Sequence, residues 1–226
     1  AAKAETVLVG INWRLALPEI EYILNDAGCT TVFVGAEYYE VVEQLAARNP
    51  SLSLIVALDG GHPSWPAFDA WRDAQAAVDP LLPMRADDDV LQLYTSGTTG
   101  HPKGVRLTNA NYLALWEASE AARWGLFDAE QVTLTCMPVF HVAGCNMGVF
   151  ALAQGSTNLI LKDVDPYKIL EFVPRYHVAY ALFVPALMLM LMIMASTGSV
   201  SMRFVMYSRE TGSSPPISTM VMASPC

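Results

Sequence analysis

The residues best suited to chemistry lie in one short run of small and hydroxyl-bearing side chains. Residues 95–105 have the sequence TSGTTGHPKGV. Glycines leave backbone N–H groups uncovered and let the chain curve around an anion, while hydroxyls can donate to phosphoryl oxygens or bind Mg²⁺. Lys103 adds a positive charge. This composition predicts a loop that binds a polyphosphate, and a plain solvated turn of Gly, Ser and Thr is the alternative.

This run differs from the phosphate loop of the P-loop NTPases, in which a glycine precedes the lysine and a serine or threonine follows it. Lys103 stands at the spacing of that motif from Gly97, but Pro102 precedes it and Gly104 follows it. The hydroxyl that binds Mg²⁺ in those enzymes is therefore absent from its usual position. The sequence predicts phosphate binding of a different type.

Strands and helices that must position this run alternate along the chain. Strands are expected at residues 30–34, 52–58, 90–94, 132–136, 157–161, 178–184 and 202–207. Helices are expected at residues 18–27, 37–48, 67–77, 108–123, 142–154, 166–172 and from residue 186 onward. This alternation indicates an α/β fold of mostly parallel sheets flanked by helices, with ligands beyond the carboxyl ends of strands. Residues 95–104 are accordingly expected to form a loop at the carboxyl end of a buried parallel strand.

Residues 94–105 (YTSGTTGHPKGV) resemble the signature of the adenylate-forming, or AMP-binding, superfamily, which includes the acyl- and aryl-CoA synthetases. Three further segments extend the resemblance to acyl-CoA synthetases and fatty-acid–CoA ligases: residues 9–28 (VGINWRLALPEIEYILNDAG), 137–144 (MPVFHVAG) and 178–187 (VAYALFVPAL). The similarity covers residues 9–207. It implies an internal fragment of the large N-terminal domain of this fold.

The resemblance implies an acid–thiol (acyl-CoA) ligase of fatty acid metabolism that uses ATP, Mg²⁺ and coenzyme A. A carboxylate attacks the α-phosphate of ATP, giving an acyl-adenylate, and the CoA thiol then displaces AMP. The residues implied in ATP and phosphate binding are Thr95, Ser96, Gly97, Thr98, Thr99, Gly100 and Lys103. Thr95 is also the implied Mg²⁺ ligand, and Lys103 is implied in catalysis because the reaction brings two anions together.

His141 lies in an apolar stretch, where a single histidine is often only a core residue. In similar enzymes the histidine of this motif lies beside the acyl pocket and the adenylate. The resemblance therefore implies that His141 is catalytic in positioning the substrate, with Val142 and Gly144 in the same pocket. His62 and His177 are expected to be structural. Packing roles are expected for Trp13, Arg14, Trp116 and Trp124.

The sequence departs from the family pattern toward its end. It contains no Y-G-x-T-E, whose Glu completes the Mg²⁺ site, no T-G-D, whose Asp binds the ribose, and no C-terminal lid domain with its lysine. We expect three parts: residues 1–86 as the end of a first βα subdomain, 87–207 as the phosphate loop with a second βα subdomain, and 208–226 as an irregular tail of doubtful reading frame. This fragment alone is expected to be inactive in acyl-CoA formation.

Charge, cysteine spacing and apolar runs indicate where the protein is located and which classes of partner it binds. A net charge of −9 disfavours nucleic acid. Cys29, Cys136, Cys145 and Cys226 show no paired spacing, which favours a reducing, cytoplasmic location. Cys136, His141 and Cys145 lack a fourth ligand for a metal site. Residues 178–195 are all apolar, but Pro185 divides them, which favours a strand and a helix over an integral membrane span. Peripheral membrane contact stays open.

The carboxylic acid that is activated is only weakly indicated. Met- and Leu-rich segments after His141 and Pro185 suit a flexible apolar cavity and hence a fatty acid. An aryl acid is the alternative substrate. A non-catalytic nucleotide-binding fragment and a membrane segment are the alternatives from other classes of protein.

Overall fold

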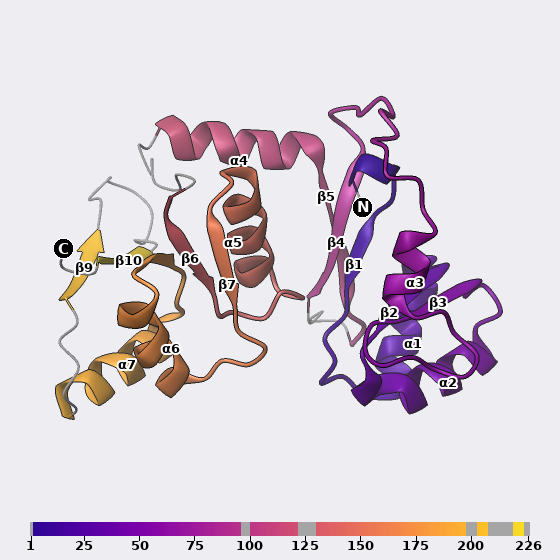
Figure 1. Cartoon of the computed structure of the whole chain (residues 1–226), viewed down its shortest axis with the longest axis horizontal. Helices are drawn as coiled ribbons and strands as arrows, with labels where there is room; N and C mark the ends of the chain where they lie inside the picture. Colours follow the sequence, from indigo (N-terminus) through magenta and orange to yellow (C-terminus); the bar gives the residue numbers. More distant parts are fainter. Residues whose placement is uncertain (1, 96–99, 122–129, 198–202, 208–218, 224–226) are drawn as a thin grey trace. The chain divides into compact units, whose positions relative to one another are not determined.

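The computed structural model describes residues 2–95, 100–121, 130–197, 203–207 and 219–223 of the chain. The chain folds into two compact units, Ala1–Leu115 and Trp116–Cys226 (Figure 1). The division expected between residues 86 and 87 stays a prediction.

The first unit contains two small sheets and the helices between their strands. Its elements are η1 (Ala2–Ala4), β1 (Leu8–Gly10), α1 (Leu17–Asp26), β2 (Thr31–Val34), η2 (Ala36–Tyr38), α2 (Tyr39–Arg48), β3 (Leu54–Ala57), α3 (Phe68–Asp73), β4 (Asp89–Thr95) and β5 (Lys103–Thr108). Strands β2 and β3 are parallel, and so are β1 and β4. Val34, Val42 and Ile55 form one apolar cluster between the first parallel pair and α2. The sequence pattern predicted these strands and α-helices, except for β1 and β5, and it predicted neither of the short helices η1 and η2.

Strand β5 corrects the expected loop at residues 95–104. Strand β4 runs on through Thr95, and β5 begins at Lys103 and pairs with it in the antiparallel sense. The connection is thus shorter than predicted, and β4 has one parallel and one antiparallel neighbour. Gly and Pro suggested a turn locally, but pairing with β4 satisfies the backbone groups of residues 103–108. Val105 and Leu107 alternate along β5 and lie opposite Leu93 and Leu91, which was a readable strand signal.

The second unit is built around a parallel sheet in the order β7-β6-β8. Its elements are β6 (Val132–Thr135), α5 (Val142–Ala153), β7 (Thr157–Ile160), α6 (Pro166–Arg175), β8 (Val178–Ala181) and α7 (Pro185–Thr197), followed by β9 (Arg203–Tyr207) and β10 (Thr219–Ala223); α4 (Asn109–Ala121) joins the two units. Helix α5 packs on β6 and β7, and α6 packs on β8 and α7 (Figure 1). The predicted α/β class with mostly parallel sheets flanked by helices is confirmed.

The core of the second unit gathers around the central strand β6. Leu134, Ile169, Val178 and Leu191 are fully buried in one cluster, each from a different strand or helix. Two parallel neighbours pair with both edges of β6, and its residues 133–135 are all buried.

The long apolar run at residues 178–195 forms strand β8 and helix α7, as the position of Pro185 predicts. Pro185 is the first residue of α7, where its missing N–H has no partner to lose. In the part of the chain that the structure describes, every helix is too short or too polar to cross a lipid bilayer.

The expectation of an irregular tail is corrected for residues 219–223. They form β10, which pairs antiparallel with β9 in the register Thr219 opposite Tyr207. The remaining tail residues, 208–218 and 224–226, lie outside the described residues. A strand is stabilised by pairing with its neighbour, here β9, so the absence of helical periodicity carried no information about it.

Two leucines of the second unit provide a matched test of this core. Leu134 is 0% exposed and Leu152 is 76% exposed. We expect Leu134→Ala to lower the free energy of unfolding by about 2 to 5 kcal/mol, because it removes contacts and leaves a cavity. Leu152→Ala is expected to change it by less than about 0.5 kcal/mol. Urea denaturation followed by circular dichroism measures both, and equal effects would contradict the position of β6 at the centre of the core.

Candidate functional site

Thr95 and Lys103 face each other across the β4–β5 hairpin. They are partners in the antiparallel register, and both are exposed. Side chains directly opposite each other lie on the same face of a sheet, with Cβ atoms roughly 4.5 to 5.5 Å apart. Gly100 lies between the two strands at a φ of 100°, which an L side chain rarely adopts. The other residues expected to bind phosphate, Ser96, Gly97, Thr98 and Thr99, lie outside the described residues.

This pairing places a hydroxyl beside a primary ammonium group at the carboxyl end of β4. A hydroxyl oxygen donates to a phosphoryl oxygen or binds a hard cation, and the ammonium supplies three donors and a full charge. Both groups suit a polyphosphate. The structure therefore brings together two of the residues that the sequence predicted to act on phosphate.

The opposite face of the hairpin carries a hydrogen-bond network that the sequence did not reveal. The Tyr94 hydroxyl donates to Asp26 Oδ2 at 2.6 Å, and Gln92 Nε2 donates to the Tyr94 oxygen at 2.9 Å. Burial, and then the hydrogen bond to Asp26, raise the pKa of Tyr94 above its ordinary value, so the phenol stays protonated at neutral pH. Asp26 ends α1 and lies 68 residues before Tyr94, which is why no local pattern pointed to the contact.

Gly104 leaves room for the same network. A Cβ at this position would lie 2.3 Å from Gln92 Nε2 and 2.9 Å from Tyr94 Cζ. Tyr94 is the cross-strand partner of Gly104, so the phenol ring lies where a larger side chain would stand. The glycine that follows Lys103 thus has a packing function, separate from any contact with phosphate.

His141 begins α5 and caps it. Its Nδ1 accepts a weak hydrogen bond of 3.5 Å from the Ala143 N–H, and this contact leaves Nε2 on the other side of the ring for another partner. The side chain is exposed, as is that of Val142. His141 Nε2 is therefore a donor available to an anionic or carbonyl group.

Gly144 lies one turn inside α5 and is buried against the preceding turn. A Cβ there would lie 2.1 Å from the Met137 carbonyl oxygen and 2.4 Å from that of Pro138. Both atoms belong to the backbone and cannot move aside cheaply. Gly144 thus lets the N-terminus of α5, with His141, lie directly on the turn that follows β6.

Several residues that the sequence analysis set aside are engaged in packing. His62 stacks on Trp65 with 3.7 Å between ring centroids, and its Nε2 lies 3.0 Å from Glu43 Oε1. Trp116 stacks on Phe150 at 6.2 Å. Trp13 remains exposed, with the Arg14 guanidinium 4.6 Å above its ring. Trp124 lies outside the described residues.

Cys136 belongs to the buried core of the second unit. Cys136 is buried, and burial raises its pKa to about 12, so it remains a neutral thiol. Among the described residues, no three His, Cys, Asp or Glu side chains are grouped so that they would hold a metal ion.

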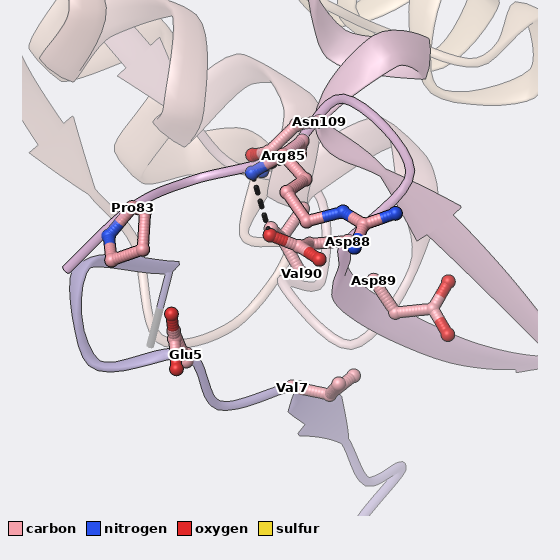
Figure 2. Close-up of a pocket in the computed structure, with 8 residues that line it drawn as sticks. All are labelled: Glu5, Val7, Pro83, Arg85, Asp88, Asp89, Val90 and Asn109. Atoms are coloured by element: carbon pink, nitrogen blue, oxygen red, sulfur yellow. Dashed lines mark hydrogen bonds between the residues drawn. The ribbon is translucent and has the colours of Figure 1, made fainter.

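A pocket of about 420 Å³ lies at the other end of β4, beside Asp88 and Asp89 (Figure 2). Glu5 adds a third carboxylate to its lining. The Asp88 carboxylate accepts a hydrogen bond from the Arg85 backbone N–H at 2.7 Å, which Figure 2 shows as a dashed line. Six residues of strand separate Asp89 from Thr95, roughly 20 Å. The excess of carboxylates makes this pocket unsuited to phosphate.

The two glycines on α5 provide a matched test of this geometry. We expect Gly144→Ala to lower the free energy of unfolding by about 1 to 3 kcal/mol, because its Cβ meets backbone atoms. Gly148 faces only Asn158 Nδ2, at 3.7 Å, so Gly148→Ala is expected to be neutral or to stabilise by up to about 1 kcal/mol. Thermal and chemical denaturation of the two variants measures the difference. Similar stabilities would show that α5 does not lie on the Met137 and Pro138 carbonyls.

Known proteins are similar to this chain in sequence and in fold. The chain is 33% identical over 201 residues to the fatty acid–[acyl-carrier-protein] ligase ScoC of Streptomyces coeruleorubidus, covering 88% of this chain and 37% of that protein. It is 30% identical to the feruloyl-CoA synthase of an Amycolatopsis species, covering 82% of this chain and 35% of that protein. The ATP-bound structure of MatB from Rhodopseudomonas palustris matches with a TM-score of 0.63 and 27% identity, covering 82% of this chain and 35% of that one.

The chain thus spans slightly more than a third of the length of these relatives. The match to the family extends over nearly all of it. Residues 1–222 match the family described as AMP-binding enzyme, and the chain belongs to that family.

Proposed function

We propose that this chain takes part in the ATP-dependent activation of a carboxylic acid. In this reaction a carboxylate oxygen attacks the α-phosphorus of ATP, the bond to the bridging oxygen breaks, and pyrophosphate leaves. The resulting acyl-adenylate is then attacked by the thiol of coenzyme A, which releases AMP. The observation that carries the proposal is the pairing of Thr95 with Lys103 at the carboxyl end of β4, in a chain of the AMP-binding enzyme family.

Thr95 and Lys103 bind the β- and γ-phosphates in this proposal. Attack of a carboxylate on ATP brings two anions together, so catalysis consists mainly of positioning and of neutralising charge. The Lys103 ammonium stabilises the departing pyrophosphate, and the Thr95 hydroxyl donates to one of its oxygens. Gly100 leaves its backbone N–H open to the same phosphates.

Mg²⁺ fits this arrangement as a partner of ATP. Protein-bound Mg²⁺ usually keeps several waters and substrate phosphates and takes only one or two protein oxygens. Thr95 provides one hard, exposed oxygen of this kind. Bound there, the ion would neutralise phosphate charge, while Lys103 supplies the fixed positive charge from the chain itself.

His141 positions the acid in this proposal, together with Val142 and Gly144. Its Nε2–H is a donor suited to a carboxylate or acyl-adenylate oxygen, and the weak contact of Nδ1 with the Ala143 N–H orients the ring at the start of α5. The exposed Val142 offers an apolar contact beside it. Gly144 acts indirectly, by letting the start of α5 lie close to the turn after β6.

A fatty acid is the proposed substrate and an aryl acid the second candidate. ScoC, by its name, acts on fatty acids, and the feruloyl-CoA synthase represents the aryl acids. ScoC also transfers its product to an acyl-carrier protein, which is the alternative acceptor to coenzyme A. Titration of the ATP-saturated chain with dodecanoate and with ferulate, followed by NMR, separates the two substrate classes by which acid binds.

The polypeptide of residues 1–226 contains neither Y-G-x-T-E nor T-G-D, the segments that complete the Mg²⁺ and ribose contacts in this family. We therefore expect it to bind ATP without forming acyl-CoA at a useful rate. Loss of one group that stabilises a transition state commonly reduces the rate by about 10²- to 10³-fold. Binding is accordingly the more informative measurement for this chain.

Lys103→Ala is expected to weaken the binding of ATP by about tenfold or more while changing the binding of AMP little. A hydrogen bond to a charged group contributes roughly 1.5 to 3 kcal/mol, and AMP lacks the β- and γ-phosphates. Arg106→Ala is the matched control, because Arg106 pairs with Asp89 and alternation along β5 places it on the other face. Isothermal titration calorimetry at constant ionic strength measures the affinities of the wild type and both variants for ATP and for AMP. Equal losses for ATP and AMP would contradict the assignment of Lys103 to the β- and γ-phosphates.

A further inference from the structure

We propose that helix α1 positions the phosphate-binding residues through two of its side chains, Asp26 and Tyr22. Asp26 is hydrogen-bonded to Tyr94, the residue before Thr95. Tyr22 stacks on His101, two positions before Lys103. This inference rests on the proposed function, because it concerns how Thr95 and Lys103 are held for ATP.

The first contact fixes the end of β4. The Tyr94 hydroxyl donates to the Asp26 carboxylate at 2.6 Å, a short distance for a bond to a charged acceptor. Successive side chains on a strand point to opposite faces, so Tyr94 faces α1 while Thr95 faces the other side. Restraining the Tyr94 ring therefore restrains the backbone that carries the Thr95 hydroxyl.

The second contact fixes the approach to β5. The rings of Tyr22 and His101 are stacked, with 4.9 Å between centroids and 22° between planes. Only Pro102, whose ring locks φ, separates His101 from Lys103. Restraining the His101 ring therefore also restrains the backbone of Lys103.

Both contacts come from one face of one helix. Tyr22 and Asp26 are four residues apart on α1, which places them one above the other on the helix surface. Tyr94 lies one residue before the end of β4, and His101 lies in the connection, two residues before β5 begins. A single helix face thus touches the chain just before Thr95 and just before Lys103.

Helix α1 is itself well fixed, which a positioning element requires. Ile23 and Leu24 are buried on its inner face. Glu19 accepts a hydrogen bond of 2.8 Å from the Ala16 backbone N–H at the helix start. Glu21 forms an ion pair of 3.7 Å with Arg48 of α2. These contacts do not involve the hairpin, so α1 keeps its place when Tyr22 or Asp26 is changed.

The test compares disruptive and conservative variants of the two side chains. Tyr22→Leu and Asp26→Ala remove the contacts, while Tyr22→Phe keeps the stacking and Asp26→Asn keeps an acceptor for the Tyr94 hydroxyl. Arg48→Ala is the control, because it breaks the Glu21 pair and touches neither Tyr94 nor His101. Affinities for MgATP, pyrophosphate and AMP are measured by calorimetry on the 226-residue chain, with circular dichroism as a check on folding.

We expect Tyr22→Leu and Asp26→Ala each to weaken MgATP and pyrophosphate binding by about three- to tenfold, since a stacked ring pair and a charged hydrogen bond are contacts of that strength. AMP binding is expected to change by less than about twofold, and Tyr22→Phe, Asp26→Asn and Arg48→Ala are expected to bind like the wild type. A merely structural role would instead reduce all three affinities together, without recovery in the conservative variants, and would overturn the proposal.

A second measurement tests the stacking without any ligand. The ring current of Tyr22 shifts the His101 Hε1 NMR signal upfield, and this shift is expected to persist in Tyr22→Phe and to vanish in Tyr22→Leu. The same signal in wild type and Tyr22→Leu would overturn the proposal.

If Lys103→Ala weakens ATP binding and the α1 variants do not, this inference fails and the proposed function stands. If the wild type binds neither ATP nor pyrophosphate, both fail.

Discussion

The antiparallel pairing of β5 with β4 is the interaction on which the candidate phosphate site depends. The register sets Thr95 against Lys103 on one face and Tyr94 against Gly104 on the other. A slip of one residue would move every side chain of β5 to the opposite face and separate the hydroxyl from the ammonium group. The buried leucines of β4, Leu91 and Leu93, oppose such a slip, because they are paired with Leu107 and Val105 of β5.

The electrostatic potential at the candidate phosphate site depends on nearby charges more than on the net charge of the chain. The chain has a net charge of −9, which repels a polyphosphate at long range. Charges separated by more than about 8 Å are largely screened at physiological ionic strength. The carboxylates beside Asp89 lie at the far end of β4, whereas Lys103 lies directly opposite Thr95. The nearest acid on α1, Asp26, already accepts the hydrogen bond from Tyr94, on the face turned away from Thr95.

Much of the fold could be predicted from sequence because its signals are local. Helical spacing and Gly28 located α1, and Pro185 divided the long apolar run correctly into β8 and α7. The phosphate-binding run was recognisable because small residues, hydroxyls and a lysine gather in consecutive positions. What escaped prediction depends on pairing and packing partners rather than on the periodicity of the segment itself. Strands β5 and β10 exist through pairing, and the contacts of Tyr94 and His101 come from a helix about 70 residues earlier.

Substitutions at Gly104 and Tyr94 are expected to be coupled. The phenol ring occupies the space that a Cβ at residue 104 would need, so a larger residue there demands a smaller one at residue 94. A smaller residue at 94, however, leaves Asp26 without its donor. The two positions are therefore coupled: a side chain at residue 104 must displace Gln92 and Tyr94, whereas a smaller residue at position 94 removes the donor to Asp26. Productive changes must come in pairs, with a compensating residue at the end of α1.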